Sequence, residues 1–406
     1  MSADSRATKK VVVLGAGIIG MTTALLIQQQ RPREYSVLVV AEHSINPYMK
    51  SAKTPSGKTV EYPETKMDFS ALEMTSPIAG AHWRSLASNS DTFLQQTEAL
   101  TYKHFMNLAI KHPNSGVRIV EGVDLYLNKK LVDDNNWHFS LVKDFKVVSD
   151  LPEGVEYATN YKTLVVNPII YIDFCKRWFL MEGGKFVTGV RVKDLRELEA
   201  IAVNEFMSKG DKSPTPVAQH FSSNELTIIN CAGLGGESIN KSLVNTNSKL
   251  MYPVKGQVVL VYAPSMQHKT ITKLGGKYMS YVIPRGSGTV ILGGTHQPHE
   301  YTPDSDPMTT DRILEECLKL APELVEGSPE DDFKSRLEIL KSNVLDVKVG
   351  FRPGRVGGVN LSVDSMYGRS GNTIRIIHNY GHNGYGFQSS YGYAVHALNL
   401  LRQNKL

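Results

Sequence analysis

Residues 11–20 read VVVLGAGIIG, a short apolar run that passes directly into a glycine-rich turn. The first four residues have the continuous β-branched hydrophobicity of a strand that is buried on both faces. Residues Met21 to Gln30 predict a helix, and Ser36 to Ala41 predict a second buried strand that ends at Glu42. Strand, GxGxxG turn, helix, strand and acidic residue therefore follow one another in order within about 30 residues.

This order predicts a dinucleotide-binding site. Gly15 permits the tight turn, Gly17 lets the backbone approach a pyrophosphate, and Gly20 lets helix and strand pack closely. The helix N-terminus offers free N–H groups to the phosphates. A carboxylate at Glu42 can accept both hydroxyls of an adenosine ribose, which suits FAD or NAD and disfavours NADP. The motif does not choose between FAD and NAD.

Length and composition exclude several classes of protein. The chain has 406 residues, of which 41% are hydrophobic and 21% charged, so it is neither collagen-like nor disordered. A net charge of +5 is too small a bias over this length to indicate a nucleic-acid partner. Three widely separated cysteines predict neither a disulfide framework nor a metal site and favour a reducing compartment.

The apolar stretch from Val11 to Ile27 superficially resembles a membrane or secretory segment. Glycines interrupt it, and it is shorter than the roughly 20 residues that a spanning helix needs. No small-residue cleavage site precedes the following glutamines. We therefore expect a soluble protein without a membrane partner.

Further elements follow from the same patterns. Residues 45–73 are polar and rich in turn residues, which predicts a long excursion without an element. The small-residue loop TSPIAGA at 75–81 fits either a planar ligand or a plain tight turn. Strands are expected at Leu226–Asn230, Gln257–Tyr262 and Thr289–Leu292, and helices at Thr310–Leu320 and Ala394–Arg402.

Two tracts near the end carry chemistry. In VGFRPGR, residues 349–355, proline and glycines predict a stiff bend that could aim Arg352 and Arg355 at a carboxylate, unless both are surface charges. Residues 378–394 alternate glycines and tyrosines before the terminal helix. Such a backbone fits a ligand pressed against main-chain atoms, or a plain turn.

At these residues the sequence resembles the D-amino acid oxidase family of FAD enzymes. Four sets of motifs occur in family order along nearly the whole chain, and together they are most similar to the yeast and fungal branch. They are GAGIIG (15–20); TSPIAGAHW (75–83); YPVKGQVVLV, SYVIPRG and LGGTHQ (252–297); and GFRPGR with HNYGHNGYGFQSSYG (350–392).

The resemblance implies an α/β fold with two domains. A doubly wound, Rossmann-like FAD-binding domain would be interleaved with a substrate domain built on a mostly antiparallel β-sheet. The expected FAD-binding domain comprises residues 8–95, 160–245 and 340–406, and the expected substrate and interface domain comprises residues 96–159 and 246–339.

The resemblance also assigns roles around the substrate. Arg352 would clamp the α-carboxylate bidentately, Tyr281 would donate its hydroxyl to the same group, and the carbonyl of Gly384 would accept from the amine. His296 would line the same pocket. Three fixed contacts around one carbon determine which hydrogen faces the flavin, and hence selectivity for D-amino acids.

The implied cofactor is non-covalent FAD, and no metal is implied. The helix beginning near Gln388 would direct its N-terminal dipole toward the flavin and stabilise the negative charge of the reduced form. The expected cofactor-binding residues are Gly15, Gly17, Ile18, Ile19, Gly20, Glu42, Thr75, Ser76, Gly80, Val166, Cys231, Gly233, Arg352, Gly381, Asn383, Gly384, Tyr385, Gly386, Phe387 and Gln388.

The implied reaction is oxidative deamination of a D-amino acid. A hydride would pass from the α-carbon to the flavin without a side-chain base, and O2 would then reoxidise the flavin and yield H2O2. The imino acid would hydrolyse to a 2-oxo acid and ammonia. A homodimer stays open as a further expectation.

The class of side chain stays open as well. A neutral D-amino acid is the first interpretation and D-aspartate the second. His296 stands where yeast enzymes for neutral substrates carry a tyrosine, and Lys273 and Lys277 lie on the loop where aspartate oxidases carry an arginine. These residues and Arg84 either pair with a second carboxylate or are solvated charges. A glycine- or sarcosine-type oxidase, and a redox sensor that binds FAD or NAD without turnover, are the remaining alternatives.

The last residues, Asn404-Lys405-Leu406, resemble the Ser-Lys-Leu peroxisomal address and differ at its first position. Because the expected reaction makes peroxide, we expect a peroxisomal protein that binds the import receptor through this tripeptide. A cytoplasmic protein is the alternative.

Overall fold

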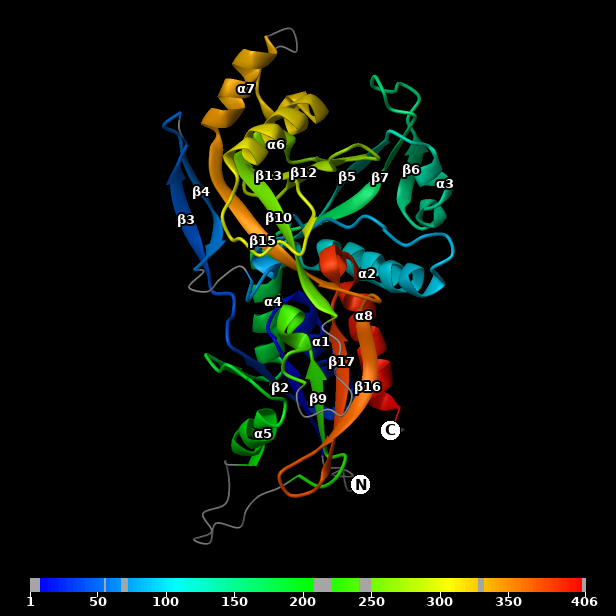
Figure 1. The fold of residues 1–406 in the computed structure, drawn as a ribbon, viewed down its shortest axis with the longest axis vertical. Helices are drawn as coiled ribbons and strands as arrows, with labels where there is room; N and C mark the ends of the chain where they lie inside the picture. The colour runs from blue at the N-terminus through cyan, green and yellow to red at the C-terminus, as the bar shows by residue number, and fades with distance from the viewer. Residues whose placement is uncertain are drawn as a thin grey trace.

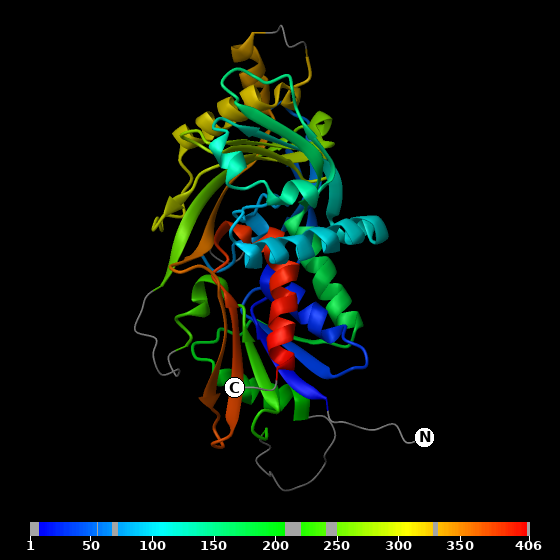
Figure 2. The same cartoon turned by 90° about the vertical axis from the view of Figure 1, so that its right-hand side faces the viewer.

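The computed structural model describes residues 8–54, 56–66, 72–207, 221–240, 250–327 and 332–403. Two large sheets organise these residues, one of six strands in the lower half of Figure 1 and one of nine in the upper half, and a two-stranded sheet accompanies them. The chain passes between the two halves several times, as both views show (Figures 1 and 2). The expected α/β class is confirmed.

The six-stranded sheet has the order β16-β17-β9-β1-β2-β8 and is parallel except at its edge strand β16. The predicted strand at the start of the chain lies in the middle, between β2 and β9, which explains its continuous apolar run. The strands are β1 (Lys9–Leu14), β2 (Tyr35–Ala41), β8 (Lys185–Thr188), β9 (Leu226–Asn230), β16 (Asn360–Tyr367) and β17 (Thr373–Tyr380).

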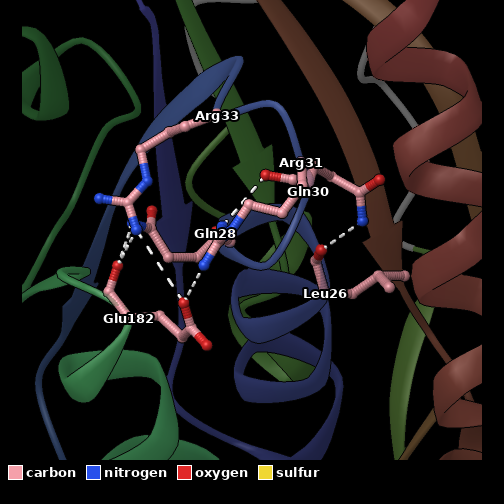
Figure 3. A network of polar contacts seen from close by, with 6 residues as sticks. All are labelled: Leu26, Gln28, Gln30, Arg31, Arg33 and Glu182. Atoms are coloured by element: carbon pink, nitrogen blue, oxygen red, sulfur yellow. Dashed lines mark hydrogen bonds and ion pairs between the residues drawn. The ribbon is translucent and has the colours of Figure 1, made fainter.

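Helix α1 (Ile18–Gln28) connects β1 to β2, and polar contacts hold its far end in place (Figure 3). The buried side chain of Gln28 donates through Nε2 to the carbonyl of Glu182 at 2.9 Å and accepts from the Val37 N–H at 3.0 Å. Arg33 donates to the same carbonyl at 2.5 Å, and Arg31 pairs with the Glu182 carboxylate. Because Glu182 ends α4 (Pro168–Met181), these bonds fix α1 against both β2 and α4.

The nine-stranded sheet has the order β14-β10-β13-β12-β11-β5-β7-β6, and β15 also pairs with β10. All its pairings are antiparallel except that of β5 with β11, so the expected mostly antiparallel second sheet is confirmed. The strands are β5 (Val117–Tyr126), β6 (Lys143–Val147), β7 (Tyr157–Val166), β10 (Met251–Tyr262), β11 (Lys269–Leu274), β12 (Ser280–Pro284), β13 (Thr289–Gly293), β14 (Gln297–Pro298) and β15 (Val344–Arg355).

The helices cover both sheets. Helix α8 packs against α1 and α2 (Figure 2), and α6 packs its buried face on β10, β12 and β13. The remaining α-helices are α2 (Thr92–Lys111), α3 (Lys130–Asp133), α5 (Glu197–Met207), α6 (Pro307–Leu320), α7 (Phe333–Ser342) and α8 (Gly386–Arg402). The 3-10 helices are η1 (Ser76–Ile78), η2 (Pro113–Ser115), η3 (Trp137–Ser140), η4 (Gly233–Gly236), η5 (Pro264–Met266), η6 (Pro322–Leu324) and η7 (Asn383–Tyr385). Both predicted helices in the C-terminal third exist, but α8 begins well before Ala394.

The excursion expected at residues 45–73 contains an element after all. Strands β3 (Pro47–Lys53) and β4 (Thr59–Thr65) form an antiparallel hairpin. Its β4 strand buries Val60, Tyr62 and Glu64, and the Glu64 carboxylate pairs with Lys348 on β15. The expectation was wrong because tertiary packing, and not local propensity, stabilises these strands.

The expected bend at residues 349–355 is also wrong. These residues continue β15 in an extended conformation, with Pro353 opposite Pro253 of β10. Strand β15 thus belongs to the larger sheet, although the range 340–406 was expected in the first domain. Strand β7 likewise crosses the expected border at residues 159 and 160. The domain boundaries as such stay a prediction.

Cysteines 175, 231 and 317 are all free and buried. Within the described ranges, no helix combines the length and the apolar character that crossing a membrane requires.

Candidate functional site

A cavity of about 740 Å3 lies where the two sheets meet. The loops that follow β1, β2 and β9, the first turns of α1 and α8, and η1 line one side of it. Residues of β10, β12 and β15 line the other. Its size is that of a site for a cofactor or a large ligand.

Helix α1 begins at this cavity with a turn that only glycine can form. Gly15 has a φ of +105°, and a Cβ atom there would lie 2.6 Å from the carbonyl oxygen of Cys231. A Cβ on Gly20 would lie 1.9 Å from the oxygen of Gly15. The Ile18 N–H donates to Ser76 Oγ at 3.1 Å, and the first bond of the helix is made by Met21, so the N–H groups between them are left for a ligand. The arrangement fits a pyrophosphate.

The carboxylate of Glu42 lies at the carboxyl end of β2, where the ribose of a dinucleotide would bind. Arg191 Nη1 lies 3.7 Å from a Glu42 oxygen and 3.8 Å from a Glu73 oxygen, and His43 Nε2 lies 3.5 Å from Glu73. The ligand atoms of Glu42, His43 and Glu73 lie within 4.8 Å of one another. The positive charge of Arg191 already offsets the charge of the two carboxylates, so a metal ion is not required to balance them.

Helix α8 also begins at the cavity. Its N-cap, Tyr385, makes no side-chain capping bond, and Gly386, Phe387 and Gln388 of its first turn line the cavity. Beside it, the buried Oδ1 atom of Asn383 has no hydrogen-bond partner in the described part of the chain. The positive end of a 17-residue helix thus faces the cavity, where it favours negative charge on a ligand.

Arg352 on β15 is half-buried and held by main-chain atoms. Its Nη1 donates to the carbonyl of Thr295 at 3.1 Å. The absence of a side chain at Gly256 makes room for it, since a Cβ there would lie 2.5 Å from Nη1. Gly384 packs on its aliphatic stem, since a Cβ atom added to Gly384 would lie 3.3 Å from Cδ of Arg352. With Nη1 engaged, the edge formed by Nε and Nη2 is available for a carboxylate.

Tyr281 on β12 lies beside this arginine. Burial raises the pKa of its hydroxyl, and the positive charge of Arg352 only partly opposes that shift. Tyr281 is therefore a hydrogen-bond donor at neutral pH. His296 lines the cavity as well, and burial followed by the charge of Arg352 lowers the pKa of its imidazole, so this ring is neutral near pH 7.

Most of the residues expected to bind cofactor or substrate line this cavity. They are Gly15, Gly17, Ile18, Ile19, Glu42, Thr75, Ser76, Gly80, Cys231, Gly233, Tyr281, His296, Arg352, Asn383, Gly384, Tyr385, Gly386, Phe387 and Gln388. Gly20 does not line the cavity, but it lets α1 pack closely against the turn at Gly15. Gly381 forms the turn after β17, with a φ of +89°.

Val166 does not line the cavity: it ends β7 of the larger sheet and packs in the hydrophobic core. Val190 and Val192 line it instead, together with Arg191. They follow β8, which lies parallel to β2, so the carboxyl ends of both strands meet at Glu42. The short run KFVTGVRVK at residues 185–193 was the signal that could have found them.

Comparisons with known proteins agree with this geometry. A family described as FAD dependent oxidoreductase (DAO) matches residues 10–400. The chain is 30% identical to a D-amino-acid oxidase of Schizosaccharomyces pombe over 97% of this chain and 96% of that protein. It is 28% identical to a D-aspartate oxidase of Cryptococcus neoformans var. grubii, covering 98% of both. The crystal structure of a glycine oxidase from Geobacillus kaustophilus has a similar fold, with a TM-score of 0.63, 16% identity and coverage of 98% and 96%.

Proposed function

Because the chain belongs to the DAO family of FAD-dependent oxidoreductases, we propose that it binds FAD non-covalently in this cavity and oxidises D-amino acids with O2 as acceptor. One observation carries the proposal: Arg352 and Tyr281 line the same cavity as the open N-termini of α1 and α8. One cavity therefore offers a grip for a carboxylate next to a site for a dinucleotide.

The residues present fit FAD. The glycine turn and first amides of α1 would hold the pyrophosphate, and Glu42 would accept the ribose hydroxyls. The unpartnered Oδ1 of Asn383 and the first turn of α8 would face the ring system. When bound, FAD supplies the hydride acceptor and passes two electrons to O2, which yields H2O2.

The side chains would fix the substrate around its α-carbon. The free edge of Arg352 binds the α-carboxylate in two parallel hydrogen bonds, and the hydroxyl of Tyr281 donates to the same group. The carbonyl of Gly384, which packs on Arg352, accepts from the amine. Such a three-point contact admits the D-configuration and presents one C–H bond to the cofactor.

The charges of the cavity favour the reactive form of the amine. Arg352 is positive, and the carboxylates of Glu42 and Glu73, the two acidic residues in the described lining, belong to the ribose end. A nearby positive charge disfavours the ammonium form, so it promotes loss of the amine proton. The resulting imino acid hydrolyses to a 2-oxo acid and ammonia, which requires no further group of the chain.

The test is anaerobic reduction of the purified yellow protein, followed by its visible flavin absorption. D-alanine and D-aspartate are compared with their L-forms, with glycine and with sarcosine. We expect bleaching by at least one D-amino acid and by neither L-form, and none in Arg352→Met, which should stay yellow. Bleaching by glycine or sarcosine alone would favour a glycine-type oxidase. If the protein binds NAD, or if no amino acid reduces its flavin, the proposal is contradicted. The remaining interpretation is then a redox sensor that binds its cofactor without turnover.

The peroxisomal location, the import receptor as partner and the homodimer stay proposals. Residues Asn404, Lys405 and Leu406 lie outside the described residues. The peroxide that the proposed reaction makes supports the location.

A further inference from the structure

Three guanidiniums line the cavity: that of Arg352, that of Arg191 beside Glu42 and Glu73, and that of Arg84. Arg84 follows η1 on the loop that starts with His82 and Trp83, and its side chain is half-buried. Its Nη1 makes one long hydrogen bond, 3.4 Å, to the carbonyl of Ser85. No carboxylate among the described residues lies within 4.0 Å of it, so its charge is not cancelled by a close ion pair.

The loop that carries Arg84 runs beside β7, because the Trp83 N–H donates to the Leu164 carbonyl at 2.8 Å, and β5 and β11 separate β7 from the β12 strand of Tyr281. Thr159, Asp124, Thr272 and Tyr281 are direct partners on β7, β5, β11 and β12, so their side chains share one face of the sheet. Tyr281 and Thr272 line the cavity. At the other end, Arg84 acts on the buried Asp124 and opposes the rise in its carboxyl pKa that burial causes.

The two cations therefore stand at opposite ends of a polar row. Tyr281, beside Arg352, lies at one end, and Asp124, the group on which Arg84 acts, lies two strands away, at a main-chain separation of about 10 Å at the usual strand spacing. Asp124 itself accepts from the hydroxyl of Tyr161 at 2.9 Å.

The other two candidate cations, Lys273 and Lys277, do not face the cavity. Lys273 follows Thr272, so alternation along β11 turns it to the opposite face, where it pairs with Glu316 at 2.5 Å. The ammonium of Lys277 lies over the ring of Tyr278, 5.1 Å from its centroid. Neither lysine lines the cavity. Arg84 alone of the three can meet a substrate.

We propose that Arg84 binds a second carboxylate, and that the preferred substrates are therefore acidic D-amino acids such as D-aspartate. The inference rests on the proposed function. A substrate with two carboxylates would match Arg352 and Arg84, whereas a neutral side chain would leave Arg84 without a carboxylate within 4.0 Å among the described residues. The neutral ring of His296 adds no competing charge.

The experiment compares kcat/KM for D-aspartate and D-asparagine, which have nearly the same shape but differ in charge. The wild type should prefer D-aspartate. In Arg84→Met the ratio of the two values should fall about 10- to 100-fold, and Arg84→Lys should restore part of it. Lys273→Met is the matched control and should leave the ratio unchanged. An unchanged ratio in Arg84→Met, or a wild type that prefers D-asparagine, overturns the inference.

A binding measurement separates this inference from the proposed function and from misfolding. Malonate and propionate, a di- and a monocarboxylate, are titrated into the flavin-loaded protein, and the change in the visible spectrum reports binding. The wild type should bind malonate more tightly, and Arg84→Met should lose that preference while it stays yellow. If D-alanine is oxidised but malonate has no advantage, the inference alone fails. If no D-amino acid is oxidised, the proposed function fails too.

Discussion

The buried carboxylate of Glu98, on α2, accepts a 2.8 Å hydrogen bond from Nε2 of Gln388 in the first turn of α8. The same carboxylate accepts from Ser85 Oγ at 2.6 Å and from the Leu86 N–H at 3.2 Å. One side chain therefore holds both the helix end that faces the cavity and the loop that carries Arg84.

We expect Glu98→Gln to loosen both elements. The amide keeps one acceptor oxygen and turns an NH2 group toward donors, so at least one buried donor loses its partner, at a cost of about 1–3 kcal/mol in the free energy of unfolding. FAD should also bind more weakly. Urea unfolding and FAD titration measure the two effects. The exposed Glu153→Gln is the control and should change stability by less than about 0.5 kcal/mol. Wild-type stability and FAD affinity in Glu98→Gln would contradict the assigned role.

Gly20→Ala should abolish the tight approach of α1 to the glycine turn. The added Cβ would lie 1.9 Å from the Gly15 carbonyl oxygen, which is backbone and cannot rotate away. The turn must open, so the dissociation constant for FAD should rise about 100-fold, equivalent to roughly 3 kcal/mol. Fluorescence of released flavin measures it. Gly57→Ala, at a φ of +86° with nothing within 4 Å, should cost about 1 kcal/mol of stability without changing FAD affinity.

Gly256→Ala should weaken substrate binding and leave FAD binding unchanged. Its Cβ would lie 2.5 Å from Nη1 of Arg352, and that guanidinium can move aside because it ends a flexible side chain. The displaced arginine would lose its alignment with the α-carboxylate, so we expect KM to rise about 10- to 100-fold, as for a lost charge-assisted pair. Gly276→Ala, outside the cavity lining, should keep wild-type kinetics. A Gly256→Ala protein with normal KM would show that Arg352 needs no such space.

The sequence predicts the parts of the fold that local patterns specify. Strands β1 and β9 are central and largely buried, so they have mostly apolar, β-branched runs that are recognisable without a structure. The β3–β4 hairpin has no such pattern, because the contact between Glu64 and Lys348 that anchors it joins distant parts of the chain. Proline and glycine near Arg352 indicated a bend, but pairing with β10 keeps this segment extended.

The candidate site divides in the same way. The glycine turn at Gly15 and Gly20 could be predicted from a local motif. That Arg352 and Tyr281 lie in one site could be expected only from the resemblance to the D-amino acid oxidase family. Sequence alone could not separate Arg84 from Lys273. Strand alternation and the Glu316 partner, which decide between them, are tertiary facts.

Acid should destabilise the protein through His138 on η3, a residue that is 2% exposed and whose ring packs against Trp137, Phe139 and Tyr161. Burial, with a further contribution from Arg84, lowers the pKa of its imidazole to about 4. The unfolded chain titrates near 6.5, so below that pH the unfolded state binds a proton that the folded state does not. The stability present above pH 6.5 is therefore lost as the pH falls toward 4.

His138→Phe keeps an aromatic ring in the same packing and removes this titration. Relative to the wild type, its free energy of unfolding should rise by about 1.4 kcal/mol for each pH unit below 6.5, until about pH 4. Urea unfolding at several pH values between 7 and 4.5 measures the difference. Phe139→Leu, on the same turn, should lower stability equally at every pH, because it leaves the imidazole in place. Parallel pH profiles for His138→Phe and the wild type would mean that His138 binds its proton equally well in the folded and the unfolded chain. The aromatic packing around it would then accommodate a charge.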